Sequence, residues 1–229
     1  MPGEFEALLQ SARDDENVVG VVLFGSRGKG AFVSQRSDWD CFVVVREMRG
    51  EHPFDRGEVV ESVEVTLDWL RDPPEWQRYA LTWLEPPLDK TGEVAAALAE
   101  ATRVDPATAA VPLDGYVNML YRSLKNDRAG LELASLLDAQ ESIPWLLDFT
   151  FRAHGRARPY NKWLEWELEQ HPLPSNSLLL SRLERIARDA DLEAQREQFR
   201  ATETLARELG FGSVIDGWEP DVAWLSVDA

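Results

Sequence analysis

The strongest constraint on this chain is a segment in which two apolar runs are joined by a Gly-Ser turn and an Asp-x-Asp pair. Gly25 and Ser26 follow the first run, and Asp38 and Asp40 open the second, which continues to Val45. Side chains alternate between the faces of a strand, so acids at positions i and i+2 point to the same side. A role as a solvated surface acid does not explain why Asp40 interrupts an apolar run.

Two carboxylates on one face of a strand repel each other unless a cation lies between them. Mg²⁺ typically takes one or two carboxylates from a protein and completes its coordination with water and substrate phosphates. Asp38 and Asp40 therefore predict a magnesium site for phosphoryl or nucleotidyl transfer. The turn at Gly25-Ser26 leads into a short predicted helix, whose backbone N–H groups and Ser26 hydroxyl are suited to binding phosphate. Arg27 either adds positive charge there or is an exposed surface cation.

A third acid is expected from residues 61–68, which also alternate. The polar residues that share one face of this stretch are Glu64, Thr66 and Asp68. On a strand beside the Asp-x-Asp strand, Glu64 or Asp68 would reach the same metal. A third carboxylate allows a second metal about 3.5–4 Å from the first, or it acts as general base on an acceptor hydroxyl. We predict Glu64 in preference to Asp68 from its local context.

Three motifs together resemble the nucleotidyltransferase superfamily that includes DNA polymerase beta. They are Gly25-Ser26, Ser37-Asp38-Trp39-Asp40 and Val63-Glu64-Val65-Thr66. The local likeness is strongest to the aminoglycoside (streptomycin/spectinomycin) adenylyltransferases, which carry a similar series. The resemblance covers roughly residues 18 to 70, and Trp39 departs from the more usual aliphatic or Tyr residue.

The resemblance implies an α+β fold with two domains. A small mixed β-sheet nucleotidyltransferase domain (residues 1–110) would be followed by an all-α helical bundle domain (residues 111–229) that binds the second substrate. The residues implied to hold one or two Mg²⁺ ions and to carry catalysis are Asp38, Asp40 and Glu64. The residues implied to bind the nucleotide are Gly25, Ser26, Arg27, Ser37 and Lys125. Lys125 is chosen because a lysine of the helical domain commonly contacts the triphosphate in this superfamily; the alternative is a surface cation favoured by the helix dipole.

The apolar periodicity along the chain agrees with this order of domains. Alternating or continuous apolar runs predict strands at 18–24, 40–46, 59–70 and 76–84. Helical spacing predicts helices at 5–14, 93–103, 116–127, 130–154, 159–170, 177–190 and 193–209. Pro144 falls inside one of them, where a kink or a first helical turn is expected. Strands are thus confined to the first half of the chain.

The composition limits the partners. The formal net charge of −17 would repel a polyanion and attract a cationic small molecule, so we expect no nucleic-acid partner. No apolar stretch is long enough to span a bilayer and no basic-then-apolar leader is present, so we expect no membrane partner. The single cysteine, Cys41, excludes an internal disulfide and suits the reducing cytoplasm.

The expected reaction is transfer of a nucleoside monophosphate, AMP from ATP, to a hydroxyl of a small and cationic molecule such as an aminoglycoside antibiotic. One alternative is an enzyme that attaches AMP to a protein side chain. Another is a nucleotide-binding sensor without catalysis. The sequence does not identify the acceptor, the base of the nucleotide or the oligomeric state, although a homodimer that completes a site is compatible with the resemblance.

Overall fold

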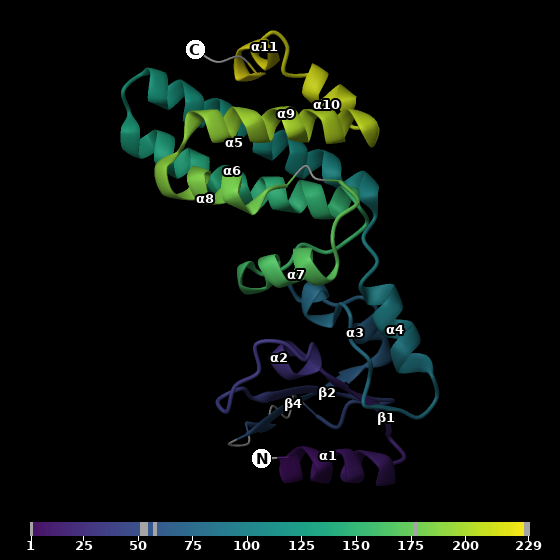
Figure 1. The fold of residues 1–229 in the computed structure, drawn as a ribbon. Helices are drawn as coiled ribbons and strands as arrows, with labels where there is room; N and C mark the ends of the chain where they lie inside the picture. The colour runs from purple at the N-terminus through teal and green to yellow at the C-terminus, as the bar shows by residue number, and fades with distance from the viewer. Residues whose placement is uncertain (1, 51–54, 57–58, 176–177, 227–229) are drawn as a thin grey trace. The chain divides into compact units, whose positions relative to one another are not determined.

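The computed structural model describes residues 2–50, 55–56, 59–175 and 178–226 (Figure 1). The chain divides into two compact units, Met1–Arg103 and Val104–Ala229. The first is a mixed sheet with helices and the second is helical, so the predicted α+β class is confirmed. The division falls slightly before the predicted boundary at residue 110, because the 3₁₀ helix η2 (Pro106–Ala109) packs on a helix of the second unit. A substrate-binding role for that unit stays a prediction.

The first unit is built on a five-stranded sheet with the order β3-β4-β2-β1-β5. The strands are β1 (Val18–Leu23), β2 (Trp39–Val45), β3 (Asp55–Arg56), β4 (Val60–Thr66) and β5 (Leu88–Asp89). β2 and β4 run parallel, whereas the other neighbouring strands are antiparallel. The parallel pair matters for function because it aligns the beginnings of two acid-bearing strands.

Helices cover both faces of this sheet. Helix α1 (Pro2–Asp14) packs on one face, where Phe5 joins a core with Cys41 and Val45. The other face is covered by α3 (Leu67–Arg71), α4 (Glu93–Ala101) and the 3₁₀ helix η1 (Glu75–Leu81), which form a core with Phe42 and Val44. α1 is seen on one side of the sheet in Figure 1, with α3 and α4 on the other. With both faces buried, an acid on either face needs a specific explanation.

Two predicted strands differ from the structure. The strand predicted to reach residue 70 ends at Thr66, whose hydroxyl accepts a hydrogen bond from the Trp69 N–H (3.2 Å) and caps α3. The strand predicted at 76–84 is wrong, because Glu75–Leu81 forms a 3₁₀ helix. Tyr79 and Leu81 are buried at alternate positions, and a short 3₁₀ helix and a strand are hard to separate on so few residues.

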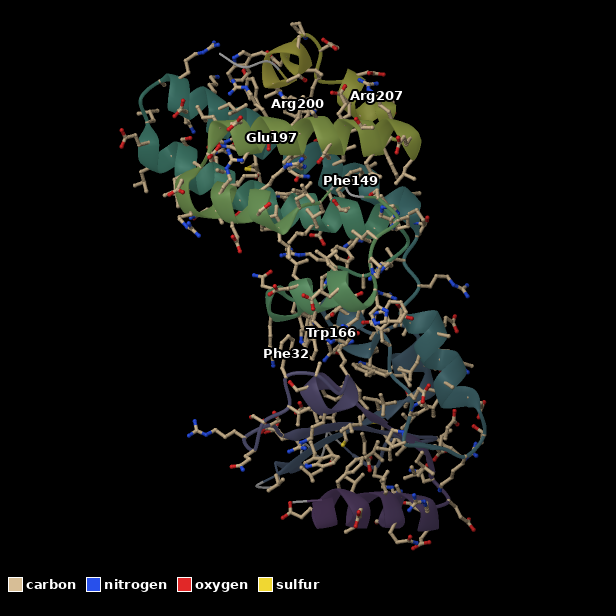
Figure 2. The ribbon with its side chains drawn as sticks, viewed as in Figure 1. Phe32, Phe149, Trp166, Glu197, Arg200 and Arg207 are labelled. Atoms are coloured by element: carbon tan, nitrogen blue, oxygen red, sulfur yellow. The ribbon has the colours of Figure 1, made fainter. Side chains whose placement is uncertain are left out.

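The second unit consists of helices. They are α5 (Ala110–Arg128), α6 (Glu132–Ala153), η3 (Asn161–Trp163), α7 (Leu164–Gln170), α8 (Leu180–Asp189), α9 (Leu192–Glu208), α10 (Gly212–Asp216) and α11 (Asp221–Ser226). α5 and α6 pair closely and are joined by a short turn at residues 129–131. Their contact forms the main core, which includes fully buried Phe149 (Figure 2). Pro144 lies inside α6 without ending it.

None of the helices in the described parts of the chain is both long and apolar enough to cross a membrane.

Candidate active site

The end of β1, the short helix α2 (Gly25–Gly28) and the start of β2 meet closely. The Phe24 N–H donates to the Asp40 carbonyl (2.9 Å), which places the Gly-Ser turn beside the second acid. Gly25 has a φ of +67°, and a Cβ added there would lie 2.8 Å from Oδ2 of Asp40. Both the backbone conformation and the available space therefore require glycine at this position. Ser26 follows in the first turn of α2.

The register of the parallel pair β2 and β4 determines which acid accompanies Asp40. Asp40 lies opposite Glu61, and the next pairs are Cys41 with Ser62 and Phe42 with Val63. Paired residues of neighbouring strands point to the same face, so Asp40 and Glu61 lie side by side. Both stand at the beginning of their strands, on the face that α3 and α4 cover farther along the sheet.

The electrostatics agree with this geometry. The pKa of the partly buried Asp40 carboxyl is raised above its usual value, first by burial and then by the nearby charges of Asp38 and Glu61. Desolvation and like charges both disfavour the ionised form of a carboxyl group. A divalent cation among Asp38, Asp40 and Glu61 would relieve this repulsion.

The placement predicted for Glu64 is wrong. Glu64 pairs with Val43, and therefore points to the face covered by α1, opposite to Asp40. Its Oε2 is buried and has no hydrogen-bond partner among the described residues. The pKa of Arg49 is raised mainly by its hydrogen bond with Asp15, and the charge of Glu64 adds to that effect. Asp68 is no replacement, because its side chain is 93% exposed in the first turn of α3 and pairs with Arg71 (2.9 Å).

Glu61, which the sequence analysis did not single out, is the acid that the register sets beside Asp40. That reasoning looked for an acid on the polar face of the stretch, yet Asp40 itself shares a face with apolar Phe42 and Val44. Period two applied from Val63 and Val65 places Glu61 on the matching face. The signal was present in the alternation, but its use requires the register, which the sequence does not provide.

Arg27 and Ser37 support the segment that leads into the acids. The Arg27 Nε–H donates to the Ser37 carbonyl (2.9 Å), and its guanidinium lies 4.4 Å from the Trp39 ring centroid. Trp39 also stacks on Phe5, with ring centroids 4.4 Å apart. The Ser37 hydroxyl accepts from the Ser34 N–H (2.9 Å). The two contacts to Trp39, which stands between the acids, fix this residue; nucleotide binding by Arg27 and Ser37 stays a prediction.

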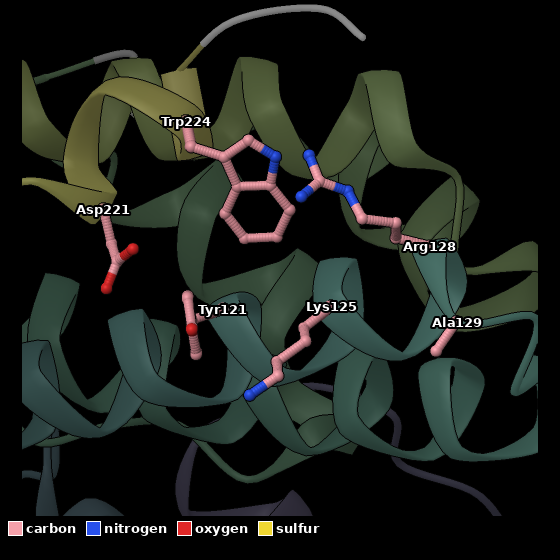
Figure 3. A pocket seen from close by; sticks show the side chains of 6 residues that line it. All are labelled: Tyr121, Lys125, Arg128, Ala129, Asp221 and Trp224. Atoms are coloured by element: carbon pink, nitrogen blue, oxygen red, sulfur yellow. The ribbon is translucent and has the colours of Figure 1, made fainter.

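Lys125 belongs to the helical unit, near the end of α5. It lines a pocket formed within that unit, and its ammonium group lies 5.6 Å from the Tyr121 ring centroid (Figure 3). Contact between Lys125 and a triphosphate stays a prediction.

Asp40 with a neighbouring acid would suit a magnesium site that substrate helps to complete. In the described parts of the chain, no three Asp, Glu, His or Cys side chains are grouped so that they hold an ion by themselves. Mg²⁺ does not need such a cage, because it binds through one or two carboxylates together with water and substrate phosphates. The donor set is all carboxylate, which is the ligand type that Mg²⁺ prefers.

Residues 6–85, about a third of the chain, match the family model described as nucleotidyltransferase domain. Among solved structures, a nucleotidyltransferase-like protein from Exiguobacterium sibiricum 255-15 is similar over 92% of this chain and 76% of its own, with a TM-score of 0.48 and 11% sequence identity. No curated protein matches this chain.

Proposed function

We propose that this protein is a metal-dependent nucleotidyltransferase that moves AMP from ATP to a hydroxyl of a small cationic molecule, of the aminoglycoside type. The observation that carries the proposal is the register that sets Glu61 beside Asp40, with Asp38 contributing to the same negative field. The nucleotidyltransferase domain at residues 6–85 supports the class of reaction. The base of the nucleotide and the acceptor molecule are to be identified by experiment.

In this proposal the acids divide the work. Asp38 and Asp40 bind Mg²⁺, which when bound neutralises charge on the triphosphate during in-line displacement. Glu61 either contributes to a second metal position or accepts the proton of the attacking hydroxyl. The bond between the α-phosphorus and its bridging oxygen breaks, pyrophosphate leaves, and the acceptor oxygen becomes bonded to the α-phosphorus.

The turn after β1 would position the triphosphate. Because Gly25 has no side chain, the turn can lie close to the Asp40 carboxylate. Backbone N–H groups of this turn and the Ser26 hydroxyl would donate hydrogen bonds to phosphate oxygens. Arg27, through Ser37 and Trp39, would keep this turn aligned with the two aspartates. Misplacement by about 1 Å of a positioned group can cost about 10²-fold in rate, so these contacts matter for turnover.

The charge of the protein supports a cationic acceptor. The net charge of −17 would raise the local concentration of a polyamine-like substrate and lower that of a polyanion. We further propose a cytoplasmic location, since Cys41 is buried and is the only cysteine in the chain.

Pyrophosphate release from ATP with Mg²⁺, measured across a panel of aminoglycosides, tests the proposal. We expect release with one acceptor, and Asp40→Asn to abolish it while the circular dichroism spectrum stays unchanged. An Asp40→Asn protein that retains more than about a tenth of the wild-type rate contradicts the metal assignment. Release only when a protein partner is present would indicate AMP transfer to that protein, and ATP binding without any release would indicate a sensor.

A further inference from the structure

The helical unit contains a pocket formed by its own residues, one of which, Lys125, is also the predicted triphosphate contact. It has a volume of about 420 Å³, within the usual range for sites that bind small molecules. Its lining comes from the end of α5 and from α11 (Figure 3). The lining residues are Tyr121, Lys125, Arg128, Ala129, Asp221 and Trp224.

The pocket carries positive charge in an acidic protein. Lys125 and Arg128 are both exposed on the last turns of α5, and in the described ranges neither makes an ion pair. They lie instead against rings: Lys125 Nζ is 5.6 Å from the Tyr121 centroid and the Arg128 guanidinium is 4.8 Å from that of Trp224. Asp221 is the one acid in the lining. Two cations without acidic partners provide the charge that an anionic group needs.

The aromatic wall of the pocket is held in place by packing. Tyr121 and Trp224 meet edge to face, with centroids 5.6 Å apart. Tyr121 also contacts Trp218 at 6.0 Å, and the Trp218 Nε1–H donates to Asp114 (2.9 Å). Rings fixed in this way offer a flat ligand contact area at little cost in conformational entropy.

We infer that this pocket binds a small aromatic ring compound that carries a phosphate group, of the chemical class of nucleoside monophosphates. The phosphate would bind Lys125 and Arg128, the ring would lie against Tyr121 and Trp224, and sugar hydroxyls or ring amino groups would donate to Asp221. A neutral ring would leave both cations unused, and inorganic phosphate would leave the aromatic wall unused. The inference goes beyond the proposed transfer reaction and does not depend on it.

Calorimetric titration of the full chain with AMP, in EDTA to disfavour any metal-dependent site, tests this inference. We expect AMP to bind more tightly than either adenosine or inorganic phosphate. Lys125→Gln and Arg128→Gln should each weaken AMP binding by about tenfold or more, because each removes a charge-assisted contact. Arg188→Gln is the matched control, since it removes an exposed cation of the same unit outside the pocket. Circular dichroism checks that each variant is folded.

Three results would overturn the inference. They are the absence of AMP binding, AMP affinity no higher than that of phosphate alone, and equal losses in Arg188→Gln and Arg128→Gln. A Lys125→Gln protein with a raised KM for ATP in the pyrophosphate assay, but with unchanged AMP titration, would instead assign Lys125 to the triphosphate. Because AMP titration needs no acceptor and no metal, its outcome is independent of whether nucleotide transfer is found.

Discussion

The substitutions Glu61→Gln and Glu64→Gln form a matched pair that tests the register of β2 and β4. Both remove one negative charge from the same strand with almost no change in side-chain volume. The side chains point to opposite faces, since Glu61 pairs with Asp40 and Glu64 with Val43. The proposed site therefore predicts a large loss of activity for Glu61→Gln and nearly unchanged activity for Glu64→Gln, although the two changes are chemically identical.

The expected loss of activity follows from the role of a positioned carboxylate. Removing a catalytic acid or base typically costs about 10²–10⁴-fold in rate, or about 3–5 kcal/mol of transition-state stabilisation. Glu61→Gln should show a loss of this size in pyrophosphate release. Glu64→Gln should stay within about twofold of wild type, as is usual for changes away from a site.

A second measurement on the same pair concerns stability. Neighbouring strands lie about 4.8 Å apart, which puts the Asp40 and Glu61 carboxylates about 5 Å apart. Their repulsion is about 0.8 kcal/mol at the dielectric constant of water and about 3 kcal/mol at an effective value of 20. Both side chains are partly exposed, so the lower figure applies. Glu61→Gln should therefore raise the Tm of the first unit by about 3–6 °C in EDTA.

Differential scanning fluorimetry in EDTA and the pyrophosphate assay in Mg²⁺ together give a clear decision. Lower activity combined with higher stability in Glu61→Gln is the signature of a functional acid. Loss of activity in Glu64→Gln with little change in Glu61→Gln would refute the register argument and would favour Glu64 as the third carboxylate.

Three further predictions concern residues around the acids. Gly25→Ala should destabilise the protein by about 1–2 kcal/mol in urea denaturation, because its φ of +67° disfavours a side chain; wild-type stability would contradict the described turn. The raised pKa of Asp40 means that its protonated form stabilises the folded state, so the protein loses this stability as pH rises from the unfolded pKa through the folded pKa. The Tm advantage of Asp40→Asn over wild type in EDTA should thus be largest at pH 7 and shrink toward pH 4, and a constant difference would argue against the raised pKa. Burial, with the nearby Asp40 charge, raises the pKa of Cys41 to about 12, so a thiol reagent at pH 8 should label the unfolded but not the native chain; fast labelling of native protein would contradict this burial.

Much of the architecture could be read from periodicity. The strands around Val21 and Val43 and the long helices α5 and α6 are predicted because each buries a face with the right spacing for its kind. The failure at Trp76–Leu84 has a physical reason: over so few residues, alternate burial of Tyr79 and Leu81 in a 3₁₀ helix has the same pattern as a strand.

The sequence by itself determined the chemistry of the acidic pair and the glycine next to it. Period-two alternation predicts that Asp38 and Asp40 share a face, and Gly25-Ser26 marks the preceding turn. These inferences are local, since they depend on residues a few positions apart and on the geometry of a single strand.

Only the tertiary structure decided which acid lies beside Asp40. Glu61 and Glu64 lie on one strand among similar sequence neighbours, and a shift of one residue in register exchanges the faces that meet Asp40. The register is set by the packing of apolar residues from both strands against helices on the two faces. That information is distributed over the whole unit, and no short stretch of sequence contains it.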